Sequence, residues 1–361
     1  MFLKMNLKKT FRGKKVIVTG HTGFKGSWLT LWLTLLGAKV LGISLNNPTK
    51  PSHYKALNIK KNLKTHNIDI RNEKKLSKII KNYKPQYLFH LAAQSLVNKS
   101  YNEPSYTWQT NTFGTINVLE SLRKLKNHCV AVIITSDKVY KNFEIKRGYK
   151  ENDRLGGIDP YSASKASAEL ALHSYIKSYF EKKSKVRIGI ARAGNVIGGG
   201  DWSNNRLIPD CVKSCAKKNK LKIRNPNSTR PWQHVIEAVY GYLTLATFLK
   251  KNYKLHGESF NFGPSNSTNK NVIKVIKEMK KHWKEINFKI EKKNFNYESK
   301  LLQLNSSKSK QILKWKCILN FKETVKLTTL WYKNFYSKNI NNFVFSKSQI
   351  LQYEKKITYR K

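Results

Sequence analysis

Three glycines spaced three residues apart follow a short β-branched run near the N-terminus. The run at residues 15–19 has the composition of a buried strand, and the glycines after it open an apolar helical stretch. A dinucleotide-binding glycine motif requires this order of strand, glycine turn and helix. Gly20 permits the tight turn, Gly23 lets the backbone approach a pyrophosphate, and Gly26 lets the helix pack closely on the sheet. The segment therefore predicts the first βα unit of a dinucleotide-binding sheet.

The alternation of strand-like and helical stretches continues through the first 190 residues. The expected strands are 15–19, 39–44, 65–69, 87–91, 131–135 and 187–191, and the expected helices are 27–36, 73–82, 108–126 and 163–180. This rhythm is typical of a parallel sheet with helices on both faces. We therefore expect an α/β fold with a doubly wound parallel Rossmann sheet.

The rhythm breaks after residue 192, where loop-forming stretches are rich in Gly, Asn and Pro. Helical patterns follow at 232–250 and 271–283. We expect an NAD-binding domain over residues 13–190 with a return segment at about 232–262, and a smaller substrate-binding lobe formed by 191–231 and 263–340. Residues 341–361 carry no clear signal and are left as an unassigned tail.

The formal net charge of +49 suggests a second class of function, a non-catalytic protein that binds RNA or another polyanion. The charge is mostly lysine spread over the whole length, however, and a nucleic-acid surface clusters Arg and Lys with exposed aromatics. We expect no nucleic-acid partner. The surface should still attract anionic molecules such as nucleotide diphosphates.

Two further features exclude other classes. The apolar run at 26–45 contains Gly37 and Lys39 and follows a strand, so it predicts a helix, a turn and a strand rather than a membrane span or signal peptide. We expect a cytoplasmic protein with no membrane partner. The four cysteines form no CxxC pair and have no histidine at ligand spacing, so we expect no metal site.

The ends of the predicted strands suggest where a cofactor would lie. The second strand ends without the acid that usually binds the adenosine ribose, so the choice between NAD and NADP is weakly marked. Asp69 and Ile70 follow the third strand and are placed for the adenine edge. Leu91, Ala92 and Ala93 end the fourth strand, where small side chains leave room for a cofactor, although a buried strand end predicts the same residues.

Tyr161 and Lys165 lie one helical turn apart, at the start of the helix that follows the fifth strand. A phenol with a pKa of about 10 is a poor base, but a nearby ammonium and an oxidised nicotinamide stabilise its phenolate. Ser136, Asp137 and Lys138 follow the fifth strand, and we expect Ser136 to hydrogen-bond the substrate oxygen together with Tyr161. The combination predicts hydride chemistry on an alcohol or ketone.

These segments resemble the extended short-chain dehydrogenase/reductases, and within them the nucleotide-sugar 4,6-dehydratases. The resemblance spans residues 13 to about 320 and rests on TGHTGFKGSW (19–28), LAAQSLV (91–97), TSDKVY (135–140), PYSASKASAEL (160–170), ARAGNVIGGGDW (191–202), RLIPD (206–210), RPWQHV (230–235) and FNFGP (260–264). The first of these, together with RAGNVIGGGDW and RPWQHV, is specific to this dehydratase group.

The resemblance implies NAD as cofactor and CDP-glucose as substrate. The residues it implies for NAD binding are Gly20, Thr22, Gly23, Phe24, Gly26, Asp69, Ile70, Leu91, Ala92, Ala93, Tyr161 and Lys165. Those implied for catalysis are Ser136, Asp137, Lys138, Tyr161 and Lys165, and those for substrate binding are Gln94, Arg192, Asn195, Arg206 and Arg230. In the implied reaction Tyr161 takes the proton of the sugar's 4-hydroxyl, Asp137 protonates the departing 6-hydroxyl and Lys138 assists at C5.

The chain also departs from the family's pattern. Thymidine-linked relatives have Glu in place of Lys138, and Lys acts as a base only when its pKa is depressed. Ser95 and Asn98 replace a usual Pro and Arg, and Asn305 replaces an expected Asp. A nucleotide-sugar 4-epimerase, which needs no acid–base pair for elimination, is the enzymatic alternative. Relatives pair through the helices expected at 108–126 and 163–180, so we expect a homodimer or homotetramer.

Overall fold

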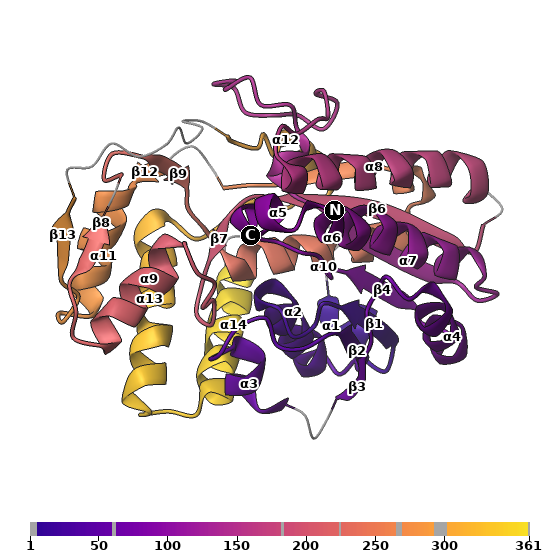
Figure 1. Ribbon diagram of the computed structural model, residues 1–361. Coiled ribbons are helices and arrows are strands. Elements are labelled where there is room, and N and C mark those ends of the chain that lie inside the picture. The colour runs from indigo at the N-terminus through magenta and orange to yellow at the C-terminus, as the bar shows by residue number, and fades with distance from the viewer. Residues whose placement is uncertain are drawn as a thin grey trace.

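A seven-stranded parallel sheet forms the centre of the protein, with the order β11-β6-β5-β4-β1-β2-β3 (Figure 1). The computed structural model describes residues 6–59, 63–181, 184–223, 225–264, 269–291 and 302–359. The strands are β1 (Lys15–Thr19), β2 (Lys39–Ser44), β3 (Lys64–Asn67), β4 (Tyr87–His90), β5 (Cys129–Ile134), β6 (Val186–Ala193) and β11 (Ser259–Phe262). The predicted fold class, a doubly wound Rossmann sheet, is confirmed.

Helices cover both faces of the sheet because successive residues of each strand point to opposite sides. Val16 and Val18 of β1 join a core with α2 (Phe24–Leu35) and α10 (Val235–Lys251). Ile17, between them, joins a second core on the other face. The helices there are α4 (Glu73–Tyr83), α7 (Gly114–Arg123) and α8 (Pro160–Tyr179). Both faces are thus apolar, as a buried parallel sheet requires.

Four predicted helices differ from the observed ones by three residues or more at their starts. Helix α2 begins at Phe24 instead of residue 27, and α10 begins at Val235 instead of residue 232. The stretch expected at 108–126 divides into α6 (Pro104–Trp108), a π-helical turn, η2 (Gln109–Phe113), and α7. Helix α8 begins at Pro160, three residues earlier than expected, because the Asp159 carboxylate accepts a 3.0 Å hydrogen bond from the Ser162 amide and caps the helix. Tyr161 therefore lies in the first turn of α8.

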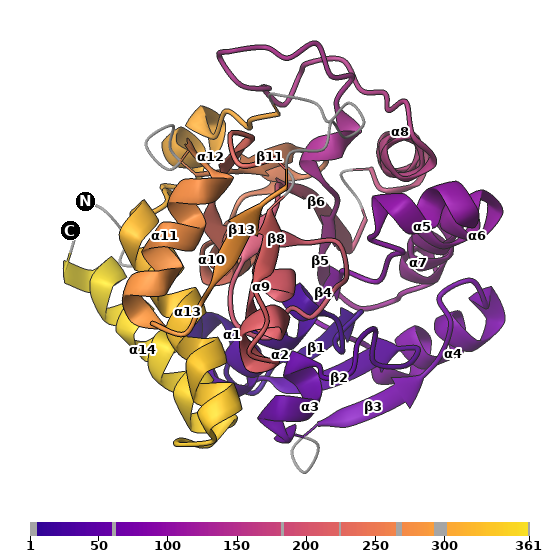
Figure 2. The same cartoon turned by 60° about the vertical axis from the view of Figure 1, so that its left-hand side comes forward.

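A smaller lobe lies to one side of the sheet (Figure 2). Its elements are α9 (Leu207–Ala216), α11 (Val272–His282), α12 (Ser307–Ile312), α13 (Phe321–Ser337) and the strand pairs β8 (Leu221–Ile223) with β13 (Phe288–Ile290) and β9 (Thr229–Pro231) with β12 (Asn269–Asn271). Between its two chain segments, α10 and β11 return to the sheet, where β11 pairs with β6. The other short elements are α1 (Leu7–Phe11), α3 (His53–Leu57), α5 (Val97–Asn102), β7 (Val196–Ile197), β10 (Gln233–His234), η3 (Asp137–Val139) and η4 (Tyr253–Leu255).

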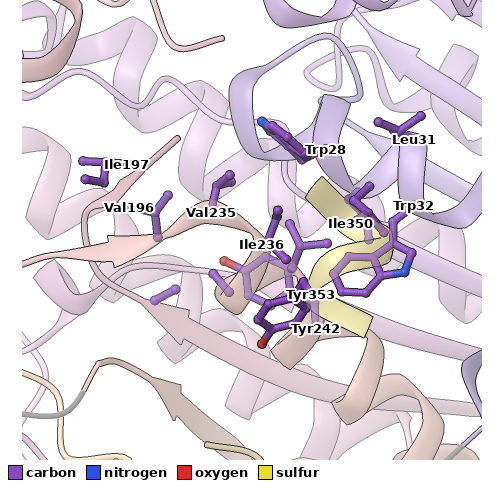
Figure 3. Close-up of a cluster of buried hydrophobic side chains, with 14 of the residues drawn as sticks. Trp28, Leu31, Trp32, Val196, Ile197, Val235, Ile236, Tyr242, Ile350 and Tyr353 are labelled. Atoms are coloured by element: carbon purple, nitrogen blue, oxygen red, sulfur yellow. The ribbon is translucent and has the colours of Figure 1, made fainter. Parts of the chain in front are cut away.

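The tail without an assignment is a helix, α14 (Asn342–Tyr359), that packs on α2, α3 and α13. Its Ile350 and Tyr353 join the buried cluster around Trp32 (Figure 3). The Trp32 indole donates a 2.7 Å hydrogen bond to Glu354, and the Tyr353 hydroxyl donates one of 2.7 Å to the buried Glu237. The C-terminal segment is thus part of the core beside α2. Among the described helices, none is long and apolar enough to cross a bilayer.

Candidate active site

The glycine turn follows β1, at the point between β1 and β4 where the order of the parallel strands reverses. Gly20 has φ of +74°, and a Cβ there would lie 2.7 Å from the Ala92 amide nitrogen. A Cβ on Gly26 would lie 2.0 Å from the Gly20 carbonyl oxygen, so neither position accepts a larger residue. No side chain caps the N-terminus of α2, which begins after Gly23. This uncapped helix end, approached closely by backbone, is a cradle that fits a pyrophosphate.

The loop between β1 and α2 is tied to the end of β2 by polar contacts. The Thr22 amide donates to the Ser44 hydroxyl at 3.3 Å, and the Thr22 hydroxyl donates to the Asn46 carbonyl at 3.2 Å. Ser44 also bonds the His21 ring at 2.9 Å. Thr22, expected to bind cofactor, therefore uses its side chain to hold the loop. Phe24 starts α2 and packs against the core.

The remaining predicted cofactor residues lie at the carboxyl ends of β3 and β4. Asp69 follows β3 by two residues, and its carboxylate pairs with Arg71 at 2.6 Å. Ile70 is buried against Gly114. Leu91, Ala92 and Ala93 follow β4, and the first two amides lie 3.2 and 3.3 Å from the Thr19 hydroxyl. These positions line the edge of the sheet on both sides of the glycine turn.

The end of β5 brings three predicted catalytic residues together. The Ser136 hydroxyl donates to the Asp137 carboxylate at 2.9 Å and accepts from the Lys138 amide at 3.2 Å. The Tyr161 hydroxyl is hydrogen-bonded to the Ser136 side chain. Ser136, Asp137 and Tyr161 are all buried, whereas Lys138 is partly exposed. An acid and a phenol thus meet around one hydroxyl.

Burial dominates the electrostatics of Tyr161 and Lys165. It raises the pKa of Tyr161 to about 12, against the hydrogen bond with Ser136, which lowers it. It lowers the pKa of Lys165 to about 8, where the charge of Lys25 lowers it further and Glu169 raises it. The expected stabilisation of the Tyr161 phenolate by the Lys165 ammonium and an oxidised nicotinamide stays a prediction. A positive charge brought to the site by an oxidised nicotinamide would lower the pKa of Tyr161.

Lys25 is a site residue that the sequence analysis missed. It lies in the first turn of α2, and its ammonium donates to the Gly194 carbonyl at 3.4 Å. Burial lowers the pKa of Lys25 to about 8, while Asp137 raises it. Its position two residues after Gly23, at the mouth of the cradle, is the sequence signal that could have identified it.

Two predicted substrate-binding residues have their polar groups engaged inside the protein. Arg192 is 1% exposed, and its guanidinium pairs with Glu169 and donates to the Tyr140 hydroxyl at 2.7 Å. The Gln94 amide donates to the Leu96 carbonyl and the Thr107 hydroxyl, both at 3.0 Å. Both polar groups are used inside the protein, so neither is presented to a diphosphate.

The other predicted substrate residues are more accessible. Asn195 is exposed between β6 and β7. Arg206, half-exposed, pairs with Asp201 at 2.8 Å and acts electrostatically on Tyr161 and Lys25, which places it beside the catalytic turn. Arg230 lies on β9 in the smaller lobe.

The described residues contain no disulfide and no cluster of side chains that could bind a metal ion. Cys129, Cys211 and Cys215 are buried and Cys317 partly so, all as free thiols. No group of three or more His, Cys, Asp or Glu side chains gathers at ligand distance there.

Comparison with known proteins is consistent with this geometry. The family model described as GDP-mannose 4,6 dehydratase matches residues 17–328. The chain is 40% identical over 351 residues to a CDP-glucose 4,6-dehydratase of Salmonella typhimurium, covering 96% of this chain and 98% of that protein. It is 24% identical over 341 residues to a UDP-glucose 4-epimerase of Mycoplasma genitalium, covering 90% and 97%.

Solved structures share the fold. A dTDP-glucose 4,6-dehydratase of Bacillus anthracis in complex with NAD superposes with a TM-score of 0.72 at 23% identity, covering 89% of this chain and 97% of that one. An epimerase of Methanothermobacter thermautotrophicus superposes with a TM-score of 0.80 at 23% identity, covering 93% and 97%.

Proposed function

Because the chain belongs to the extended short-chain dehydrogenase/reductases, in the family described as GDP-mannose 4,6 dehydratase, we propose that it is a lyase acting on a nucleotide sugar. The proposed reaction converts CDP-glucose to CDP-4-keto-6-deoxyglucose and water. The substrate follows the 40% identical relative, whose full length the chain matches. The observation that carries the proposal is the position of Asp137, which shares Ser136 with Tyr161.

The residues of the cradle fit NAD. The close approach at Gly20 and Gly26 and the uncapped N-terminus of α2 suit a pyrophosphate, and the carboxyl ends of β3 and β4 extend on either side. When bound, NAD supplies the hydride acceptor for C4 of the sugar and the hydride donor for C6. Every other part of the reaction is proton transfer and positioning by the protein.

Tyr161 is placed to move the proton of the sugar's 4-hydroxyl. Its Oη is buried and hydrogen-bonded to Ser136, so a substrate oxygen between them would meet both hydroxyls. The Lys165 ammonium, one turn along α8, stabilises the phenolate that results. The oxidised sugar carries a ketone at C4, which acidifies the C5 proton.

Asp137 is placed to protonate the departing 6-hydroxyl. Its Oδ1 accepts from Ser136, and its Oδ2 faces Gly194, where a Cβ would lie only 3.1 Å away. A protonated carboxyl in this position donates while water is lost across C5–C6. Lys138, adjacent and partly exposed, is proposed to assist at C5.

Arg206, Asn195 and Arg230 are the proposed contacts to the nucleotide diphosphate. Among the three, Arg206 has the best support as a diphosphate contact. Its charge lowers the pKa values of Tyr161 and Lys25, and its side chain is half-exposed. Its planar guanidinium suits a diphosphate better than an ammonium does.

We also propose a cytoplasmic homodimer or homotetramer without a nucleic-acid partner. Four free thiols suit a reducing compartment. The pairing surface is discussed below with its test.

Incubation of the protein with CDP-glucose and NAD tests the proposed function. We expect a product that has lost one water and carries a ketone at C4 by NMR. UDP-glucose and dTDP-glucose, as matched substrates, should react more slowly. An isomer of unchanged mass, inverted at C4, would instead establish the 4-epimerase alternative.

A further inference from the structure

Glu169 is a fully buried acid that the proposed chemistry does not use. It follows Tyr161 and Lys165 at four-residue steps on α8, so the three side chains share one helix face. All three are buried, and Glu169 is 0% exposed. A carboxylate without solvent access destabilises the folded state unless it is paired and hydrogen-bonded, so the partners of Glu169 indicate its role.

The partners of Glu169 come from the two strands beneath α8. The Thr135 hydroxyl, one residue after β5, donates to Glu169 Oε1 at 2.5 Å. Arg192 of β6 donates through Nε at 3.0 and 2.9 Å to the two carboxylate oxygens and also pairs through Nη2. One carboxylate thus joins the catalytic helix to the end of β5, immediately before Ser136.

Arg192 extends the connection to the C-terminal lobe. Its Nη1 donates to the Tyr140 hydroxyl at 2.7 Å, and Tyr140 donates to Asn261 Oδ1 at 2.8 Å. Asn261 Nδ2 in turn donates to the Asn305 carbonyl at 3.2 Å. Residues 135 and 140, on either side of the Asp137 turn, are therefore both held by the same buried network.

We propose that Glu169 is a positioning residue: through Thr135 and Arg192 it fixes the Ser136–Asp137 turn against the helix that carries Tyr161 and Lys165. The backbone hydrogen bonds within the turn are long, since the Val139 and Tyr140 amides lie 3.4 and 3.5 Å from their acceptors, and the shorter bonds there are made by side chains. Its geometry consequently depends on the flanking side chains. This inference rests on the proposed function for its kinetic consequence, but its structural part does not.

Thr135→Val is the variant that isolates the connection. It keeps the β-branched shape and leaves the Arg192–Glu169 pair intact, whereas Glu169→Gln would leave Arg192 as an uncompensated buried charge. Loss of a hydrogen bond to a charged acceptor predicts a fall in kcat of roughly tenfold or more, with KM for CDP-glucose changed less than about twofold. Thr135→Ser retains the hydroxyl and should restore kcat.

Hydrogen exchange gives a readout that needs no activity. In Thr135→Val, amides of residues 136–140 should exchange faster than in the parent, while those of the rest of β5 and α8 are unchanged. Thr247→Val, which removes a buried hydroxyl bonded to the Leu243 carbonyl on α10, is the matched control and should alter neither kcat nor this peptide.

The outcomes separate the two proposals. A parent protein inactive on CDP-glucose contradicts the proposed function, and the exchange data alone then decide the role of Glu169. Parental exchange at residues 136–140 in Thr135→Val overturns the positioning role, as does faster exchange across the whole protein. Local loosening with kcat restored by Thr135→Ser supports it.

Discussion

Asp137 and Tyr161 are both hydrogen-bonded to Ser136. In the proposed reaction, Asp137 is needed for the elimination of water but not for the oxidation at C4. In that reaction, oxidation at C4 uses Tyr161 and Lys165 together with the nicotinamide. Loss of water also needs a proton for the departing hydroxyl, and Asp137 is the acid beside Tyr161. The two steps should therefore be separable by substitution.

Asp137→Asn keeps the shape of the side chain and removes its transferable proton. Oxidation at C4 should survive, while elimination slows by about 10²–10⁴, the usual contribution of a positioned acid. Stopped-flow absorbance of the reduced nicotinamide after mixing with CDP-glucose measures this as a slowly decaying transient. Dehydration at the parental rate would reduce Asp137 to a turn residue.

Lys25→Met tests the partly buried charge beside the glycine turn. A lysine whose pKa falls from 10.5 to about 8 on folding binds fewer protons folded than unfolded, so its contribution to the free energy of unfolding rises as the pH rises through that window. Below pH 8 the burial cost is present in full. The variant should be more stable than the parent by roughly 1–3 kcal/mol at neutral pH, with the difference shrinking toward pH 10.5. Urea unfolding across this range measures it, and a pH-independent difference would contradict it.

The chemistry-bearing residues could be predicted because their spacing encodes their geometry. Tyr161 and Lys165 share a helix face by sequence alone, and the Ser136–Asp137 turn follows a strand that must end at the same sheet edge. Arg192 could not be predicted, because the sequence does not reveal that a buried carboxylate, Glu169, occupies its guanidinium. The guanidinium of Arg192 points inward because the fold brings Glu169, which is remote in sequence, next to it.

Helices and strands with a regular pattern of apolar residues could be predicted from the sequence, and those without one could not. Strands β1 and β2 match the expected bounds because each is a continuous apolar run. Helix α14 was not predicted because two of its four buried residues are polar. These buried residues are Ser346, Gln349, Ile350 and Tyr353, and they do not form the apolar helix face that a sequence pattern reveals. The Ser346 hydroxyl accepts from the Trp331 indole, and the Gln349 amide nitrogen donates to the Leu327 carbonyl. No local sequence pattern reports these contacts with another helix.

Tyr353→Phe measures how firmly α14 is held. The Glu237 carboxylate accepts from the Ile318 and Leu319 amides and from Tyr353 at 2.7–2.8 Å, yet burial raises its pKa to about 7. The folded state thus binds more protons than the unfolded chain between pH 4.5 and 7, and the free energy of unfolding falls as pH rises through this window.

Loss of the Tyr353 hydroxyl should cost about 1.5–3 kcal/mol, with the greater loss above pH 7, where Glu237 is ionised. Urea unfolding on both sides of pH 7 checks this. Leu351→Ala, at a position 42% exposed on the same helix, is the control and should change little. Equal stability of Tyr353→Phe and parent above pH 7 would contradict the account.

At the scale of the whole molecule, apolar side chains remain on the outer surface of η2 and α8. Phe113, Leu170 and Tyr179 are 57%, 60% and 52% exposed. Helices α7 and α8 already cover this face of the sheet, so these three exposed side chains lie outside the core that the two helices form with it. These helices are the ones through which we expect a second copy to pair.

Leu170→Glu should shift the protein from dimer or tetramer toward monomer in light scattering at micromolar concentration, because a carboxylate in an apolar interface is not solvated. Leu351→Glu on α14 should leave the mass unchanged. A parent that is monomeric under these conditions contradicts the expected assembly.

We propose that one site oxidises C4, eliminates water across C5–C6 and reduces C6 of the same sugar. CDP-glucose carrying deuterium at C4 tests this proposal, with the position of the label in the product read by NMR. We expect a 4-keto-6-deoxy product with the deuterium at C6. Deuterium retained at C4 of an epimer, or absent from the C6 of the product, would contradict it.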